Sequence, residues 1–196
     1  MTRLRLVHRA GRTWLRATAL LVTAVVIALA GCASSDGGGG PATPAGFQQT
    51  KTPDFNLAVP DGWRIAEHEV GDGSGDKFVV ARPRGGDVNR AELRAASKHD
   101  YGGDINGATL LFGAEISTRR PGAKRVLTKA IDVSGAADAR RIEFTVPAGG
   151  RLAAARIVTV LALTDARTLV NVTIGVGEDD PVTRRIDGIV GSLKVG

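Results

Sequence analysis

The chain has 196 residues, with 26 Lys and Arg against 20 Asp and Glu, and a single cysteine. Five arginines and no acidic residue lie in the first 31 residues, so the rest of the chain has 21 basic and 20 acidic residues and is nearly neutral. This balance argues against a nucleic-acid partner, which needs a basic stripe with interleaved aromatic residues. One cysteine also excludes a disulfide within the chain.

The first 31 residues have the order of a secretory signal peptide. A basic segment containing Arg3 to Arg16 precedes an apolar run from Ala17 to Ala30. The run is shorter than the ~20 apolar residues that a transmembrane helix needs. It ends in Leu29-Ala30-Gly31-Cys32, which matches the lipobox of bacterial lipoproteins at all four positions. We therefore expect cleavage before Cys32.

Cys32 is the predicted attachment point of the mature protein. Acylation would consume a lone thiol that is otherwise a liability in an oxidising compartment. A diacylglyceryl thioether supplies two acyl chains, and two chains hold a protein stably on a bilayer, whereas one holds it only marginally. The sequence thus predicts a membrane partner through the Cys32 lipid anchor, on the extracytoplasmic face of the cell membrane.

Residues 32–52 are expected to form the lipidated cysteine and a flexible tether. The segment is small and polar, with four consecutive glycines from Gly37 to Gly40. Such a composition cannot bury a core. A flexible chain of about 20 residues spans about 25 Å. Residues 53–196 then have the size of one domain.

The domain has mostly strand patterns. Phe55, Leu57 and Val59 alternate with other residues, and Pro60-Asp61-Gly62 predicts a turn from which a strand with Trp63 returns. Further strands are expected at residues 77–82, 110–116, 127–133, 140–146, 157–163 and 170–176. Short connections at 147–150 and 164–167 predict antiparallel hairpins.

Two helices complete the prediction. Residues 88–98 are expected to be helical, with Asn89 as the N-cap. In the last helix, Asp180 is a natural N-cap and Pro181 fits the first position, while apolar residues from Val182 to Leu193 share one face. The expected fold class is therefore α+β, an antiparallel sheet packed by helices.

Several short motifs carry a family resemblance. The pattern Phe-x-Leu-x-Val-Pro-x-Gly-Trp, here Phe55 to Trp63, resembles the start of PsbP-like domains. The segment Gly135-Ala136-Ala137 before a strand and the ending Ile189 to Leu193 fit the same family. With the lipobox in front, residues 53–196 are similar to the LpqN/LpqT-type lipoproteins of actinobacteria. The resemblance implies an α/β/α sandwich and an accessory, usually non-catalytic role at the cell envelope, and it carries over no catalytic residue.

Candidate reactive residues are few. His68 and His99 each have an acidic neighbour, but adjacent residues in a strand point to opposite faces, so neither pair forms a dyad. Trp63 is expected in the core. We expect no catalytic residue and no enzyme activity.

Two loop motifs are also set aside. Asp72, Ser74 and Asp76 have the spacing of a calcium loop, yet Pro83 stands where the bidentate glutamate is expected. The Gly175-Val176-Gly177 segment lacks the third glycine of a dinucleotide fingerprint, and three acidic residues follow it. We therefore expect neither a metal nor a cofactor.

Three functions remain open. The favoured one is a non-catalytic binding or scaffolding module that docks envelope proteins. The second is a carrier of an amphiphilic envelope lipid or glycolipid, which requires an apolar cavity between sheet and helix. The third is a hydrolase with a dispersed site drawn from residues such as His68, His99 and Ser74, which requires a histidine within hydrogen-bond reach of a serine or carboxylate in a cleft.

Overall fold

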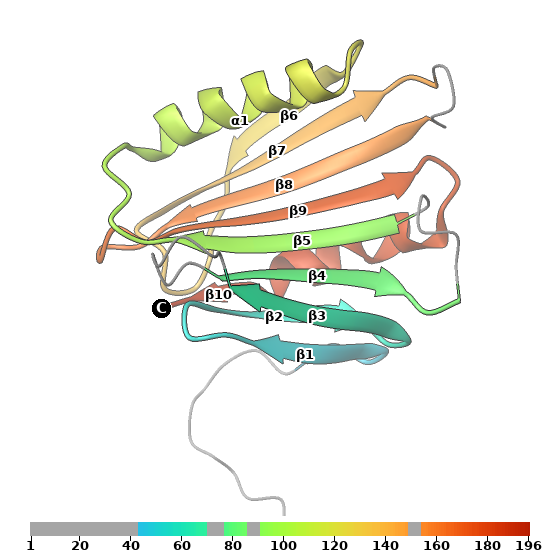
Figure 1. Ribbon diagram of the computed structural model, residues 1–196, viewed down its shortest axis with the longest axis horizontal. Coiled ribbons are helices and arrows are strands. Elements are labelled where there is room, and N and C mark those ends of the chain that lie inside the picture. Colours follow the sequence, from blue (N-terminus) through green and yellow to red (C-terminus); the bar gives the residue numbers. More distant parts are fainter. Residues whose placement is uncertain (1–42, 70–76, 86–90, 149–153) are drawn as a thin grey trace, which may run out of the picture. The chain divides into compact units, whose positions relative to one another are not determined.

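The computed structural model describes residues 43–69, 77–85, 91–148 and 154–196 (Figure 1). The large sheet contains β3 (Trp63–Glu69), β4 (Lys77–Pro83), β5 (Ala91–Lys98), β6 (Lys124–Ala130), β7 (Asp138–Val146), β8 (Ala155–Leu163) and β9 (Leu169–Gly177). The small sheet contains β1 (Phe47–Lys51), β2 (Phe55–Pro60) and β10 (Lys194–Val195). The helices are α1 (Ile105–Arg119), the 3-10 helix η1 (Pro181–Arg185) and α2 (Ile186–Gly191). The predicted α+β class is confirmed.

The large sheet is antiparallel throughout, in the order β3-β4-β5-β9-β8-β7-β6. β8 lies between β7 and β9 and is buried along most of its length, as its apolar sequence predicts for a central strand. The pairing of β7 with β8 and of β8 with β9 confirms the two predicted hairpins. β6 begins three residues before the predicted strand and forms an edge of the sheet.

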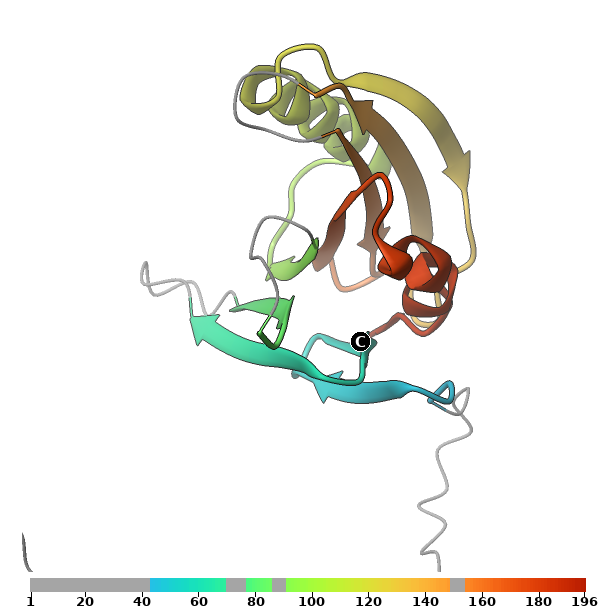
Figure 2. The same cartoon turned by 90° about the vertical axis from the view of Figure 1, so that its right-hand side faces the viewer.

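Helices cover both faces of the large sheet (Figure 2). On one face, Phe112 and Ile116 of α1 pack with Ile142 and Phe144 of β7. On the other face, η1, α2 and the small sheet share a second core with the large sheet. Trp63 is 4% exposed and lies in this second core, as predicted. No helix in the described ranges is long and apolar enough to cross a membrane.

The predicted helix at residues 88–98 is wrong, because its described part forms β5. Buried residues occupy every second position of this strand: Ala91, Leu93, Ala95 and Ser97. That is the period of a strand and not of a helix. β5 pairs with β4 on one side and β9 on the other, and this pairing overrides the helix propensity of its alanines. The predicted cap, Asn89, lies outside the described residues.

The predicted strand at residues 110–116 is also wrong, because it forms the middle of α1. The carboxylate of Asp104 accepts a hydrogen bond from the backbone N–H of Gly107 at 2.6 Å and caps the helix. Buried residues then recur at intervals of three or four: Ile105, Ala108, Thr109, Phe112 and Ile116. Because the outer side of α1 also carries leucines, a period of two is read as easily as a period of 3.6.

Trp63 does not return along the preceding strand. β2 pairs with β1 and β10 in the small sheet, whereas β3 pairs with β4 in the large sheet. Between them Gly62 has a φ of +80°, a left-handed conformation that glycine adopts without strain. The chain therefore passes from one sheet to the other at the predicted turn.

The tether predicted for residues 32–52 ends earlier than expected. Phe47–Lys51 forms β1, paired with β2 from Phe47 opposite Pro60 to Lys51 opposite Asn56. Gln48 also donates a hydrogen bond from Nε2 to the carbonyl of Trp63 at 2.8 Å. The polar residues of an edge strand hide its pattern in the sequence, so the folded part begins before residue 53.

The predicted closing helix is confirmed as η1 followed by α2. The carboxylate of Asp180 accepts a hydrogen bond from the backbone N–H of Val182 at 2.8 Å, and Pro181 opens η1. Ile186 and Ile189 of α2 are buried in the second core. The short strand β10, which the sequence did not predict, then adds to β2.

Candidate functional site

Several sequence-predicted site residues lie outside the described residues. They comprise the lipobox Leu29, Ala30, Gly31 and Cys32 and the loop residues Asp72, Ser74 and Asp76. Across the part of the chain that the structure describes, no three His, Cys, Asp or Glu side chains are grouped so that they could hold a metal ion.

The two histidines make separate contacts. His68 is exposed on β3, and its ring stacks on that of Phe78, the residue opposite it on β4, with ring centroids 4.8 Å apart. His99 follows β5 and contacts Asp54. His68 therefore takes part in a cross-strand aromatic pair.

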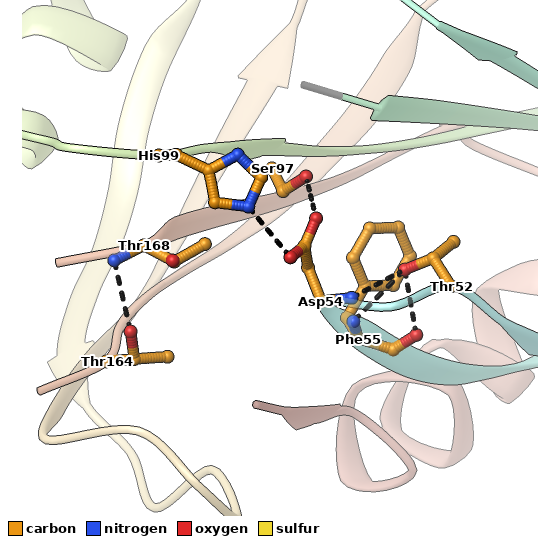
Figure 3. A network of polar contacts seen from close by, with 7 residues as sticks. All are labelled: Thr52, Asp54, Phe55, Ser97, His99, Thr164 and Thr168. Atoms are coloured by element: carbon orange, nitrogen blue, oxygen red, sulfur yellow. Dashed lines mark hydrogen bonds and ion pairs between the residues drawn. The ribbon is translucent and has the colours of Figure 1, made fainter. Parts of the chain in front are cut away.

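Asp54 lies at the centre of a polar cluster that the sequence analysis missed (Figure 3). Its Oδ1 is 2.9 Å from His99 Nε2, and its Oδ2 accepts a hydrogen bond from Ser97 Oγ at 2.6 Å. The backbone N–H of Asp54 in turn points to Thr52 Oγ1 at 3.3 Å. This turn between β1 and β2 aims the carboxylate at the end of β5, so the cluster ties the small sheet to the large one.

The order of groups in this cluster does not suit nucleophilic catalysis. A serine nucleophile needs a histidine beside it to take its proton, with the carboxylate beyond the histidine. Here Asp54 stands between Ser97 and His99, and Ser97 donates its hydroxyl proton to the carboxylate. Ser97 is also buried, at 4% exposure. The arrangement is that of a structural clamp.

A second charged cluster links β7 and β8 to α2. Glu143 is 6% exposed and accepts hydrogen bonds from Arg141 Nε at 2.8 Å and Arg156 Nε at 3.1 Å. Arg141 also pairs with Asp187 of α2 at 2.7 Å. A buried carboxylate needs such partners, because it would otherwise lose hydration without compensation.

The exposed side of α1 is unusual for a helix in contact with water. Leu110 and Leu111 are 67% and 68% exposed. The helix has two charged residues, Glu115 and Arg119, and they pair with each other at 3.0 Å. Large apolar side chains on a helix normally face the core, so two adjacent leucines at this exposure are unusual.

Even the hydroxyl groups on this side are turned inward to the helix backbone. Ser117 and Thr118 each donate a hydrogen bond to the carbonyl four residues earlier, at 2.9 Å. A shallow hollow of about 250 Å³ lies beside them, open to solvent between α1 and the edge of the sheet. It is lined by Leu110, Gly113, Ala114, Ser117, Arg125 and Phe144.

Glu92 lies between Arg82 and Arg94 on the α1 side of the large sheet. Burial on its own raises the pKa of this carboxyl. The hydrogen bonds and charges of Arg94 and Arg82 outweigh burial, so the pKa of Glu92 lies below its ordinary value of 4.5.

Comparison with known proteins gives the fold. No protein-family model matches the chain, and no curated protein matches its sequence. The solution structure of CyanoP, the cyanobacterial PsbP of Synechocystis sp. PCC 6803, matches with a TM-score of 0.56 at 19% identity, over 82% of this chain and 98% of that one. A variant of the protein Mog1 matches with a TM-score of 0.52 at 12% identity, over 76% of this chain and 95% of that one.

A crystal structure of LpqN of Mycobacterium tuberculosis, described as involved in cell envelope biogenesis, also matches, with a TM-score of 0.42 at 16% identity, over 76% of this chain and 91% of that one. At these identities the similarity defines architecture. The CyanoP match, which spans nearly all of that protein, gives this chain a PsbP-like α+β fold.

Proposed function

We propose that the protein is an envelope lipoprotein, held at the membrane through Cys32, that works as a non-catalytic binding or scaffolding module. The anchor rests on the complete lipobox Leu29-Ala30-Gly31-Cys32. The binding role rests on the exposed side of α1, with Leu110 and Leu111 outward and no unpaired charge in the helix. Large apolar side chains that are exposed side by side on a folded domain are a feature of interaction sites.

Carriage of an amphiphile in a closed cavity has less support. The hollow beside α1 has a volume of about 250 Å³ and is open on one side. Ligand pockets that bury most of a small molecule usually enclose ~300–1,000 Å³. The hollow therefore suits an extension of a docking surface better than a carrier site. A hydrolase has less support from the described residues, because the serine beside the Asp54–His99 pair, Ser97, is buried; Ser74 lies outside those residues.

The binding role can be tested by photo-crosslinking in intact cells. Benzoylphenylalanine in place of Leu111 should form an adduct with an envelope component, whereas the same residue in place of Gln49, exposed on β1, should not. Equal adduct formation at the two positions, or none at either, would contradict binding through α1. A variant with Asp54→Ala that keeps its fold should capture the same component, since the clamp has no part in binding.

A further inference from the structure

The large sheet has an uneven distribution of charge between its two faces. Residues directly opposite each other on neighbouring strands point to the same face. Ile142 of β7 packs under α1 and lies opposite Thr159 of β8. Thr159 lies opposite Thr173 of β9, and Thr173 lies opposite Arg94 of β5. Arg94 therefore lies on the same face as α1.

The same register assigns the other charged strand residues to a face. On the α1 face, the described strands carry six basic and two acidic side chains. These are Arg64, Arg82, Arg94, Lys98, Arg125 and Arg140, with Glu92 and Asp138. Since the chain after residue 31 is nearly neutral, the α1 face of the large sheet is markedly more basic than the remainder of that chain.

Part of this positive charge is left unpaired. Arg82 and Arg94 share Glu92, and Arg140 pairs with Asp138. Four further cations on this side are exposed and form no ion pair among the described residues: Arg64, Lys98 and Arg125 on the strands and Arg120 at the end of α1. Leu110 and Leu111 of α1 thus lie beside a broad group of unpaired cations, while the two charges of the helix itself, Glu115 and Arg119, pair with each other.

An anionic bilayer matches both properties at once. Basic side chains near an anionic leaflet each contribute about 1 kcal/mol of attraction, and apolar side chains of a surface helix enter the headgroup boundary. The cations are spread over three strands and a helix end, and the hollow beside α1 is shallow, so the surface suits a broad flat partner better than an inserted peptide.

We propose, building on the binding role of α1, that this side of the domain rests on an anionic lipid bilayer, with Leu110 and Leu111 in the headgroup region. The proposed anchor permits this orientation. The chain enters the domain beside β1, on the opposite face of the large sheet from α1 (Figure 2). The 12 residues from Cys32 to Thr43 reach at most about 40 Å when extended. Three layers about 10 Å apart place α1 about 20 Å from the small sheet.

The test uses the full chain with vesicles that contain no other protein. Benzoylphenylalanine in place of Leu111 should form lipid adducts in vesicles of phosphatidylcholine with phosphatidylglycerol, and far fewer in phosphatidylcholine alone. The same residue in place of Gln49 should form few adducts in either. Adduct formation at position 111 should fall as salt is added, because exposed charges are screened. Equal labelling in both kinds of vesicle would overturn the proposal.

Charge variants supply a matched control. Lys98→Gln with Arg120→Gln and Arg125→Gln should lower adduct formation at position 111 by tenfold or more, given the attraction per cation near an anionic surface. Lys51→Gln with Lys124→Gln and Lys129→Gln removes the same charge from exposed positions elsewhere and should leave it unchanged. Equal loss in both sets would contradict a contact specific to the α1 side.

The experiment in cells separates this proposal from the binding role. A lipid adduct at position 111 would support both. A protein adduct would support binding through α1 and overturn the bilayer as its occupant. If neither cells nor vesicles give an adduct above the Gln49 control, both proposals fail.

Discussion

His99 Nε2 lies 2.9 Å from Asp54 Oδ1, although 45 residues separate the two in the chain. The other oxygen of the same carboxylate holds the buried hydroxyl of Ser97. Asp54 therefore connects the turn between the first two strands of the small sheet with the end of β5, a strand in the middle of the large sheet.

Asp54→Ala should lower the free energy of unfolding by about 1–3 kcal/mol, because it leaves the hydroxyl of Ser97 buried without an acceptor. Asp54→Asn should cost less, since its amide oxygen can still accept one hydrogen bond. The midpoint of urea unfolding measures both effects. If Asp54→Ala unfolds at the same urea concentration as the unmodified protein, the cluster does not stabilise the contact between the two sheets.

Gly135 should be essential to the fold. Its φ is +84°, and a Cβ at this position would lie 1.8 Å from the carbonyl oxygen of Val195 in β10. Gly135→Ala must move the backbone or detach β10, and we expect a loss of at least about 2 kcal/mol.

Gly191 offers the matched control for that substitution. It ends α2, and a Cβ there would meet nothing within 4 Å. Gly191→Ala should be neutral or should stabilise the protein by up to about 1 kcal/mol. Thermal unfolding of the two variants side by side gives the comparison, and equal midpoints would contradict the close approach of Gly135 to β10.

Glu143→Gln should destabilise the protein more than any single exposed charge change. It leaves Arg141 and Arg156 facing each other without the carboxylate between them. Because Arg156 is 37% exposed, we expect a cost of about 2–3 kcal/mol, below that of breaking a fully buried pair. Asp187→Asn, at an 84% exposed partner of Arg141, should stay within about 0.5 kcal/mol. If Asp187→Asn lowered the free energy of unfolding as much as Glu143→Gln, the buried position of Glu143 would not be what makes the cluster stabilising.

The sequence predicts strands well where one face is wet or where both faces are buried. Ile142 and Phe144 alternate with Arg141 and Glu143, and β7 follows from that alternation. Where composition is ambiguous, the pattern of apolar residues does not distinguish a helix from a strand. The alanines of β5 suit a helix locally, and the exposed Leu110 and Leu111 blur the period of α1.

The polar clusters could not be predicted at all. Asp54 reaches His99 only because β2 and β5 are brought together by the packing of two sheets, and Glu143 reaches Arg156 through the register of β7 on β8. No local pattern contains either relation. The charge asymmetry of the large sheet likewise depends on which strands are neighbours, and it becomes visible only when the register is known.

Glu92 should make stability depend on acid in a defined direction. Its pKa is below 4.5 in the folded protein, so its contribution is fully present above the ordinary pKa and is lost as pH falls through the lowered folded pKa. Glu92→Gln should therefore reduce the loss of stability between pH 5 and strongly acidic solution, measured by urea unfolding. With Arg82→Gln and Arg94→Gln only burial remains, the pKa of Glu92 should rise, and the same replacement should no longer reduce that loss.

Cys32 should carry the lipid that holds the protein at the membrane. Transfer of a diacylglyceryl group needs the sulfur of Cys32, so metabolic labelling with a fatty acid should mark the unmodified protein and leave Cys32→Ser unmarked. Gly31→Asp should also abolish the label, because the lipobox requires a small residue before the cysteine. Ala33→Ser, one residue beyond the lipobox, should be labelled normally and serves as the control. Equal labelling of the unmodified protein and Cys32→Ser would place any lipid elsewhere and remove the anchor from the proposed function.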